Sequence, residues 1–171
     1  MKNRFIYLFI VLYLALIVQT TLIDYIKVFN IKPNLVLALI VCVALIRGDK
    51  EASFFGLAAG LLQDILCGLS IGPYALMGFI VGFALGGFNK RFYRDNVFVC
   101  AIITFVVSII YEGIIILPTI PLSDYQLILQ LIKSDIIVEA LYNVVISIPV
   151  YILILKINDK IVIREKSTNK Y

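Results

Sequence analysis

The sequence predicts an all-α, polytopic membrane protein with six transmembrane helices and a short interfacial helix before the last of them. Two observations support this fold class: 62% of the 171 residues are apolar and only 15% are charged, and the mean hydropathy is +1.04. Soluble domains contain roughly 45–50% apolar and about 25% charged residues. A soluble domain of this size cannot bury so much apolar surface, which excludes a water-soluble fold, a disordered chain and a disulfide-rich secreted module. Six spans of about 20 residues leave no room for a separate soluble domain.

The first apolar segment, residues 5–23, follows two basic residues, Lys2 and Arg4. This order resembles a secretory signal peptide. The cleavage pattern of small residues that ends such a peptide is missing, because Gln19-Thr20-Thr21 comes next. We therefore expect a retained first span.

The second segment, residues 33–46, is short for a transmembrane span even when Pro33 and Asn34 form its first turn. It ends abruptly at residues 47–51, where four charged residues surround Gly48. A glycine among charges is typical of a tight, solvated turn.

The later segments have clear boundaries at charges, glycines or prolines. The four remaining apolar segments are 52–69, 73–88, 97–117 and 136–157. An uncharged hairpin of residues 68–73 joins the first two of these. The connection 118–135 contains Ser123-x-x-Gln126, which resembles a capping box, and then polar and apolar residues at helical spacing. We expect a short interfacial helix there, and one integral membrane domain over residues 1–171 with a short basic tail at 158–171.

The distribution of positive charge predicts the topology. With six spans and the N-terminus in the cytoplasm, 12 of the 15 Lys and Arg residues lie on the cytoplasmic side. Five spans, with the second segment re-entrant and the N-terminus outside, give the same distribution. Lys2 and Arg4 directly precede the first span and favour the six-span topology, with both termini cytoplasmic.

Residues for catalysis or metal binding are hard to find in this sequence. The chain has no His, no G-x-S-x-G elbow and no P-loop, so we expect no enzyme activity, no metal and no cofactor. Cys42, Cys67 and Cys100 lack C-x-x-C spacing and are interpreted as small packing residues. The basic and aromatic stretch at residues 90–94 is interpreted as a membrane anchor and not as a nucleic-acid surface.

Polar residues within the predicted spans gather at one depth. At about 1.5 Å of helical rise per residue, all of them fall toward the outer leaflet: Gln19, Asn34, Asp64, Glu112, Glu139 and Asn143. Intramembrane carboxyl groups are candidates for functional sites, because an isolated charge in lipid is costly. The alternatives are structural. Glu139 is then simply interfacial, while Asp64 stays neutral and donates a hydrogen bond to a neighbouring helix.

Small residues recur every fourth position in two places. One series contains Gly56, Gly60, Asp64, Gly68 and Gly72, and the other contains Gly78, Gly82 and Gly86. Faces of this kind allow helix backbones to approach closely in lipid. They predict either packing inside the bundle or an interface between two copies of the chain.

The residues now support a comparison with a known family. The relevant features are Pro33-Asn34-Leu35, Arg47-Gly48, the stretch from Gly56 to Asp64 with its G-x-x-x-G-L-x-x-D pattern, and then Gly68 and Gly72 with Ala75-Leu76. Together they resemble the MreD family of rod shape-determining membrane proteins. The specific part of the resemblance is residues 31–79, and the rest agrees in size and span pattern.

This resemblance implies a non-catalytic component of the bacterial elongation machinery in the cytoplasmic membrane, which helps to position lateral peptidoglycan synthesis. The implied partners are an MreC-like single-pass protein, a RodA-type polymerase with its class B penicillin-binding protein, and an MreB-like filament, with no nucleic acid. It also implies a fold relationship to the substrate-binding subunits of energy-coupling-factor transporters. The alternative function is therefore a small-solute-binding subunit of a vitamin-type transporter. Under either function the candidate contact residues are Pro33, Asn34, Gly48, Gly56, Gly60, Asp64, Gly68, Gly72, Glu112 and Glu139.

Overall fold

The computed structural model describes residues 2–21, 31–67, 72–88, 96–116 and 135–168. Six helices make up these residues: α1 (Lys2–Thr21), α3 (Leu35–Arg47), α4 (Asp49–Cys67), α5 (Pro73–Phe88), α6 (Val97–Ile116) and α8 (Ile137–Thr168). The predicted all-helical class is confirmed, and each of the six predicted apolar segments coincides with one helix. The interfacial helix predicted after Ser123 lies outside the described residues.

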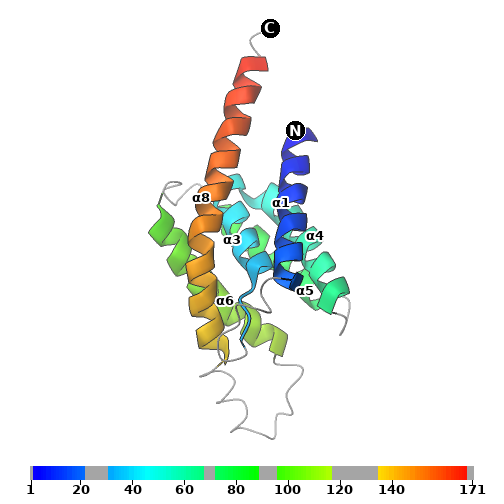
Figure 1. Ribbon diagram of the computed structural model, residues 1–171, viewed down its shortest axis with the longest axis vertical. Helices are drawn as coiled ribbons and strands as arrows, with labels where there is room; N and C mark the ends of the chain where they lie inside the picture. The colour runs from blue at the N-terminus through cyan, green and yellow to red at the C-terminus, as the bar shows by residue number, and fades with distance from the viewer. Residues whose placement is uncertain (1, 22–30, 68–71, 89–95, 117–134, 169–171) are drawn as a thin grey trace, which may run out of the picture.

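Helix α3 is the centre of the bundle (Figure 1). Every residue from Val36 to Ile46 is buried, and the helix contacts α1, α4, α5, α6 and α8. A helix that is apolar on all sides is stable only when other helices surround it. Its 13 residues extend about 20 Å, well short of a bilayer core of about 30 Å. The short second segment is therefore a fully enclosed core helix.

The turn between α3 and α4 consists of Gly48 alone. Its φ of +89° lies in the left-handed region that favours glycine, and its N–H donates to the carbonyl of Ala44 at 3.2 Å. The tight turn follows the prediction, and Asp49 and Lys50 directly after Gly48 are exposed. The Arg47 side chain is only 4% exposed and forms an ion pair with Glu51 at 3.6 Å.

Helices α6 and α8 lie on one side of α3 and contact each other. In the described residues, Val97–Ile116 and Ile137–Ile161 are the two segments long and apolar enough to cross a membrane. Many of their large apolar side chains face outward, including Phe98, Ile102 and Val145, each at least 65% exposed. Such surfaces match a lipid environment. Three shorter apolar helices accompany them: Ile6–Thr21, Leu35–Arg47 and Pro73–Gly87.

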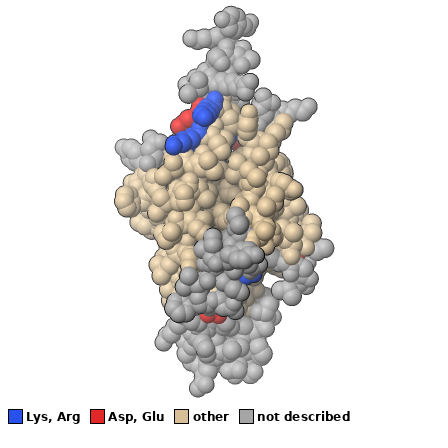
Figure 2. All heavy atoms as spheres, in the orientation of Figure 1, with Lys and Arg blue, Asp and Glu red and all other residues tan. Residues whose placement is uncertain are grey.

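The two ends of the molecule differ from its middle. Helix α1 begins at the same end at which α8 finishes (Figure 1), and α8 continues past the predicted boundary at residue 157 to Thr168. On the face that Figure 2 shows, charged side chains gather toward the two ends, and uncharged residues form the described surface between them.

Candidate functional site

The first candidate region is the contact between α4 and α5, where glycine backbones touch. A Cβ atom added to Gly56 would overlap the carbonyl of Gly78, and one added to Gly78 would overlap the carbonyl of Gly56. At Gly60 the added atom would overlap the carbonyl of Tyr74 and lie 2.6 Å from the Cα of Ala75. No side chain fits at these positions, so the two helices are in direct backbone contact.

The same contact continues toward the other end of the hairpin. A Cβ at Gly82 would overlap the carbonyl of Ala52, and one at Gly86 would overlap Asp49. Each step of four residues forward along α4 therefore matches four residues backward along α5, as expected for antiparallel helices with small residues at every fourth position. These glycine faces pack against each other inside one chain.

Asp64 completes this hairpin by capping α5. Its Oδ2 accepts hydrogen bonds from the backbone N–H groups of Gly72 and Ala75, and its Oδ1 accepts from that of Tyr74, each at 3.0 Å. The side chain is 1% exposed. The first N–H groups of a helix lack partners within the helix, and an acidic side chain satisfies them. The expected donation by Asp64 to a neighbouring helix is thus wrong, because three donors already surround its oxygens.

The remaining glycines of the predicted series have separate roles. Gly72 has φ +127° and precedes the first residue of α5, so its conformation requires glycine. No atom lies within 4 Å of an added Cβ there. Gly68 lies outside the described residues.

The second candidate region joins α3, α4, α6 and α8 through polar side chains. We call it the polar cluster, and its members are Asn34, Gln63, Ser108, Glu112, Glu139 and Asn143. Asn34 is its hub. Its N–H donates to Asn143 Oδ1 at 2.6 Å and its Nδ2 donates to Glu112 Oε1 at 3.1 Å. Its own Oδ1 accepts from Leu37 N–H at 3.0 Å, which caps α3.

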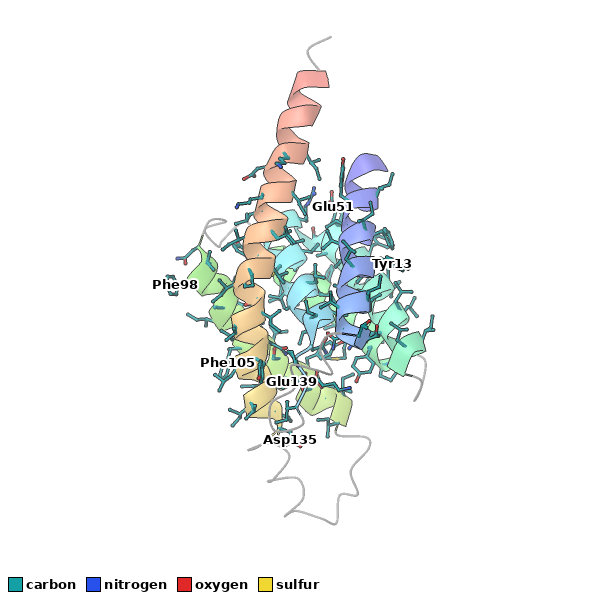
Figure 3. The ribbon with its side chains drawn as sticks, viewed as in Figure 1. Tyr13, Glu51, Phe98, Phe105, Asp135 and Glu139 are labelled. Carbon is teal, nitrogen blue, oxygen red and sulfur yellow. The ribbon has the colours of Figure 1, made fainter. Side chains whose placement is uncertain are left out.

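Two carboxyl groups meet in the polar cluster. Glu112 on α6 and Glu139 on the first turn of α8 share a side-chain hydrogen bond. A hydrogen bond between two carboxyl groups requires that at least one of them is protonated. Asn143 hydrogen-bonds Glu139, and its Nδ2 donates to Ser108 Oγ at 3.0 Å. Figure 3 places Glu139 on the part of α8 far from its C-terminal end.

Two glutamines lie beside Asn34, Gln19 outside the polar cluster and Gln63 within it. The amide of Gln19 on α1 donates to the carbonyl of Pro33 and accepts from the N–H of Leu35, both at 2.9 Å. Gln63 on α4 approaches Asn34 Oδ1 through its Nε2 at 3.5 Å. Its Oε1 is buried and has no hydrogen-bond partner among the described residues.

The sequence and the structure agree in part on this region. The polar residues predicted at one depth separate into two groups, since Asp64 caps α5 while Asn34, Glu112, Glu139 and Asn143 meet. Ser108 and Gln63 were not predicted as site residues. Ser108 lies four residues before Glu112, which places both on one face of α6, and this spacing was the available signal.

The described residues include no group of three or more Cys, Asp or Glu side chains placed to hold a metal ion. Cys42 and Cys100 are buried free thiols whose sulfur atoms lie 3.8 Å apart between α3 and α6. The arrangement supports helix association and hydrogen bonding more than any bond-breaking chemistry.

A family model described as rod shape-determining protein MreD matches residues 1–157. The chain belongs to the MreD family. The match runs from α1 through most of α8 and thus covers both candidate regions. MreD proteins are membrane proteins that act in cell shape, which agrees with the apolar helices described above. No curated protein and no solved structure matches the chain.

Proposed function

We propose that this MreD-family protein is a non-catalytic component of the bacterial cell-elongation complex, which helps to position and regulate lateral peptidoglycan synthesis. The observation that carries the proposal is the family match over residues 1–157. A role in rod shape is what that family does. The elongation complex is the more specific context that we infer.

The packing of the bundle supports a scaffold role. Helix α3 is enclosed, and α4 and α5 touch through their backbones at every fourth residue. Close-packed helices of this kind hold a fixed shape in lipid. A fixed shape suits a protein whose task is to hold partners at defined positions.

We further propose that the chain crosses the cytoplasmic membrane six times, with both termini in the cytoplasm. The start of α1 and the end of α8 at one end of the molecule support an even number of crossings (Figure 1). The five-span alternative requires the termini on opposite sides. Reporter fusions at each terminus test this topology, and a periplasmic N-terminus would overturn it.

The proposed partners are an MreC-like single-pass membrane protein, a RodA-type polymerase with its class B penicillin-binding protein, and an MreB-like filament. Detergent purification of the tagged full chain, with mass spectrometry of the proteins that accompany it, tests this set. We expect an MreC-like protein to be enriched over a control purification with an unrelated tagged membrane protein. Enrichment of an ATP-hydrolysing coupling module in its place would overturn the proposal and favour the solute-binding alternative.

Complementation tests the function directly. In a strain depleted of this protein, cells are expected to become round, and expression of the full chain is expected to restore rods. Rod-shaped growth after complete depletion would contradict the proposed role.

A further inference from the structure

The second half of α8 presents an exposed face that changes from apolar to basic. Four exposed side chains follow one another along it at four-residue spacing: Ile148, Ile152, Lys156 and Lys160. Residues four apart lie on the same side of a helix. The other side of the same turns is buried, with exposures of 3% or less at Tyr151, Ile154 and Asn158. The four exposed residues, which we call the α8 stripe, therefore face away from the bundle.

The two lysines of the α8 stripe lie at the depth of lipid headgroups. At about 1.5 Å of rise per residue, Lys156 is about 29 Å and Lys160 about 35 Å along the axis from Ile137, the first residue of α8. A bilayer has a hydrocarbon core of about 30 Å, and its headgroup layers bring the total to about 40–45 Å. A tilt of about 20° shortens both depths by only about 2 Å. With Ile137 at one boundary of the core, both ammonium groups lie at the opposite boundary.

Both ammonium groups are available to an external anion. No hydrogen bond or ion pair joins Lys156 or Lys160 to another residue in the part of the chain that the structure describes. Asp159 is exposed as well, but it takes part in a separate interaction. Figure 2 shows basic side chains toward the upper end of the molecule, next to a surface of uncharged residues. Cations at this depth attract the anions that the headgroup layer contains, which are phosphodiester groups.

We propose that the α8 stripe binds an anionic phospholipid. The ammonium groups of Lys156 and Lys160 donate hydrogen bonds to its phosphate oxygens, and an acyl chain lies along Ile152 and Ile148. The order of the side chains matches the lipid, because the basic pair lies at headgroup depth and the apolar pair lies within the hydrocarbon core. This inference goes beyond the proposed function and depends only on the insertion of α8 in the membrane.

A fluorescent reporter beside the α8 stripe tests this proposal. The chain has no Trp, so Leu153→Trp adds a single indole at a 51% exposed position, three residues before Lys156. The full chain is reconstituted in vesicles of phosphatidylglycerol and phosphatidylcholine, and one of the two lipids carries brominated acyl chains, which quench the indole on contact. We expect brominated phosphatidylglycerol to quench more than brominated phosphatidylcholine at the same mole fraction. Equal quenching by the two lipids would overturn the proposal.

Matched variants show whether the preference belongs to the two lysines. Lys156→Gln and Lys160→Gln are each expected to lower the preference for phosphatidylglycerol by up to about fivefold, since one basic residue at a membrane surface contributes up to about that factor. Lys50→Gln makes the same change of charge at an exposed position on the first turn of α4. We expect it to leave the preference unchanged. An equal loss in Lys50→Gln would show a general charge effect and overturn the proposal.

A conservative replacement and a second reporter complete the controls. Lys156→Arg combined with Lys160→Arg retains both charges and is expected to retain the preference, whereas a loss would contradict the role of charge. Ile110→Trp places the indole on α6 at a 54% exposed position. There we expect equal quenching by the two lipids. A preference of the same size at Ile110→Trp would overturn the α8 stripe as the site.

Two further measurements distinguish a lipid from other anions. Inorganic phosphate, added at constant ionic strength, is expected to leave the quenching unchanged because it has no acyl chain. Loss of the preference would show a site for free phosphate and overturn the lipid. A protein that co-purifies with the wild type but not with Lys156→Gln, while that variant keeps its lipid preference, would show an acidic protein surface as the occupant and overturn the proposal.

The outcome is separable from that of the proposed function. The vesicles contain the chain without any protein partner, so equal quenching would overturn the lipid site and leave the role in cell elongation intact. Rod-shaped growth after depletion would contradict that role and leave the lipid preference intact.

Discussion

The contact between α4 and α5 and the contact among α3, α6 and α8 hold helices together by different means. Along α4 and α5, glycines remove the side chains and the backbones touch. Around Asn34, polar side chains from separate helices join through hydrogen bonds. Lipid is as apolar as the helices themselves, so burial between helices adds little, and close packing or hydrogen bonding must supply the association energy. In this protein, close packing joins α4 to α5, and hydrogen bonding joins α3, α6 and α8.

The two regions also differ in how completely their polar groups are satisfied. Asp64 accepts three backbone N–H groups and needs no further partner. In the polar cluster, Gln63 Oε1 is buried and has no hydrogen-bond partner among the described residues. Burial alone therefore does not show whether a polar side chain of this bundle has all of its hydrogen-bond partners.

A large side chain placed in the glycine contact between α4 and α5 is expected to have the largest effect on stability. Gly60→Leu places a side chain where the backbone of Tyr74 lies, so the cost should exceed the about 1–3 kcal/mol typical of an overpacked core. Thermal unfolding in detergent and the yield of folded protein measure it. Gly113→Leu on α6 is the matched control, because no atom lies within 4 Å of an added Cβ there. Equal yields for both variants would show that the glycine contact has no packing role.

Loss of the hydrogen bonds that cap α5 is expected to have the second-largest effect on stability. Asp64→Asn replaces one accepting oxygen with an NH₂ group that faces N–H donors, and a buried donor left unpaired costs about 1–3 kcal/mol. We expect a lower unfolding midpoint and partial loss of rod-shape complementation at reduced protein level. Asn96→Ala is the control, since Asn96 caps α6 at an exposed position through the N–H of Phe98. Wild-type stability of Asp64→Asn would contradict the capping role.

Loss of a single hydrogen bond of the polar cluster is expected to destabilise the protein less than loss of the α5 cap. Ser108→Ala leaves Asn143 Nδ2 without its acceptor, and the expected cost is about 1 kcal/mol. Ser53→Ala provides the comparison, because the buried Ser53 hydroxyl donates to Lys50 O within its own helix, α4. If the two variants unfold at the same midpoint, the Ser108 hydrogen bond does not hold α6 to α8.

The smallest effect on stability is expected at Gln63, which links the two regions. Gln63→Leu removes one long hydrogen bond of 3.5 Å together with an unpartnered buried oxygen. Loss of the hydrogen bond destabilises the protein and loss of the unpartnered oxygen stabilises it. The stability should therefore stay within about 0.5 kcal/mol of the wild type. Thermal unfolding of the free chain measures it. A cost as large as that of Ser108→Ala would mean that the Gln63 hydrogen bond stabilises the fold.

Much of the architecture follows from patterns along the chain. Unbroken apolar runs predict the helices, and Pro73–Phe88 is predicted with the boundaries that the structure has. The brevity of the second segment is visible in the sequence, and so is the tight turn at Gly48. Four-residue spacing predicts the glycine faces on α4 and α5, because that spacing is a property of a single helix.

The sequence by itself determined the membrane class, the helices and which residues share a face. Only the tertiary structure decided which face meets which helix. Asp64 has no local partner, and its three donors are supplied by the start of α5 across the hairpin. Glu112 and Glu139 meet because α6 packs against α8. Helical periodicity fixes directions around one axis, whereas the choice of neighbour depends on the packing of all the helices at once.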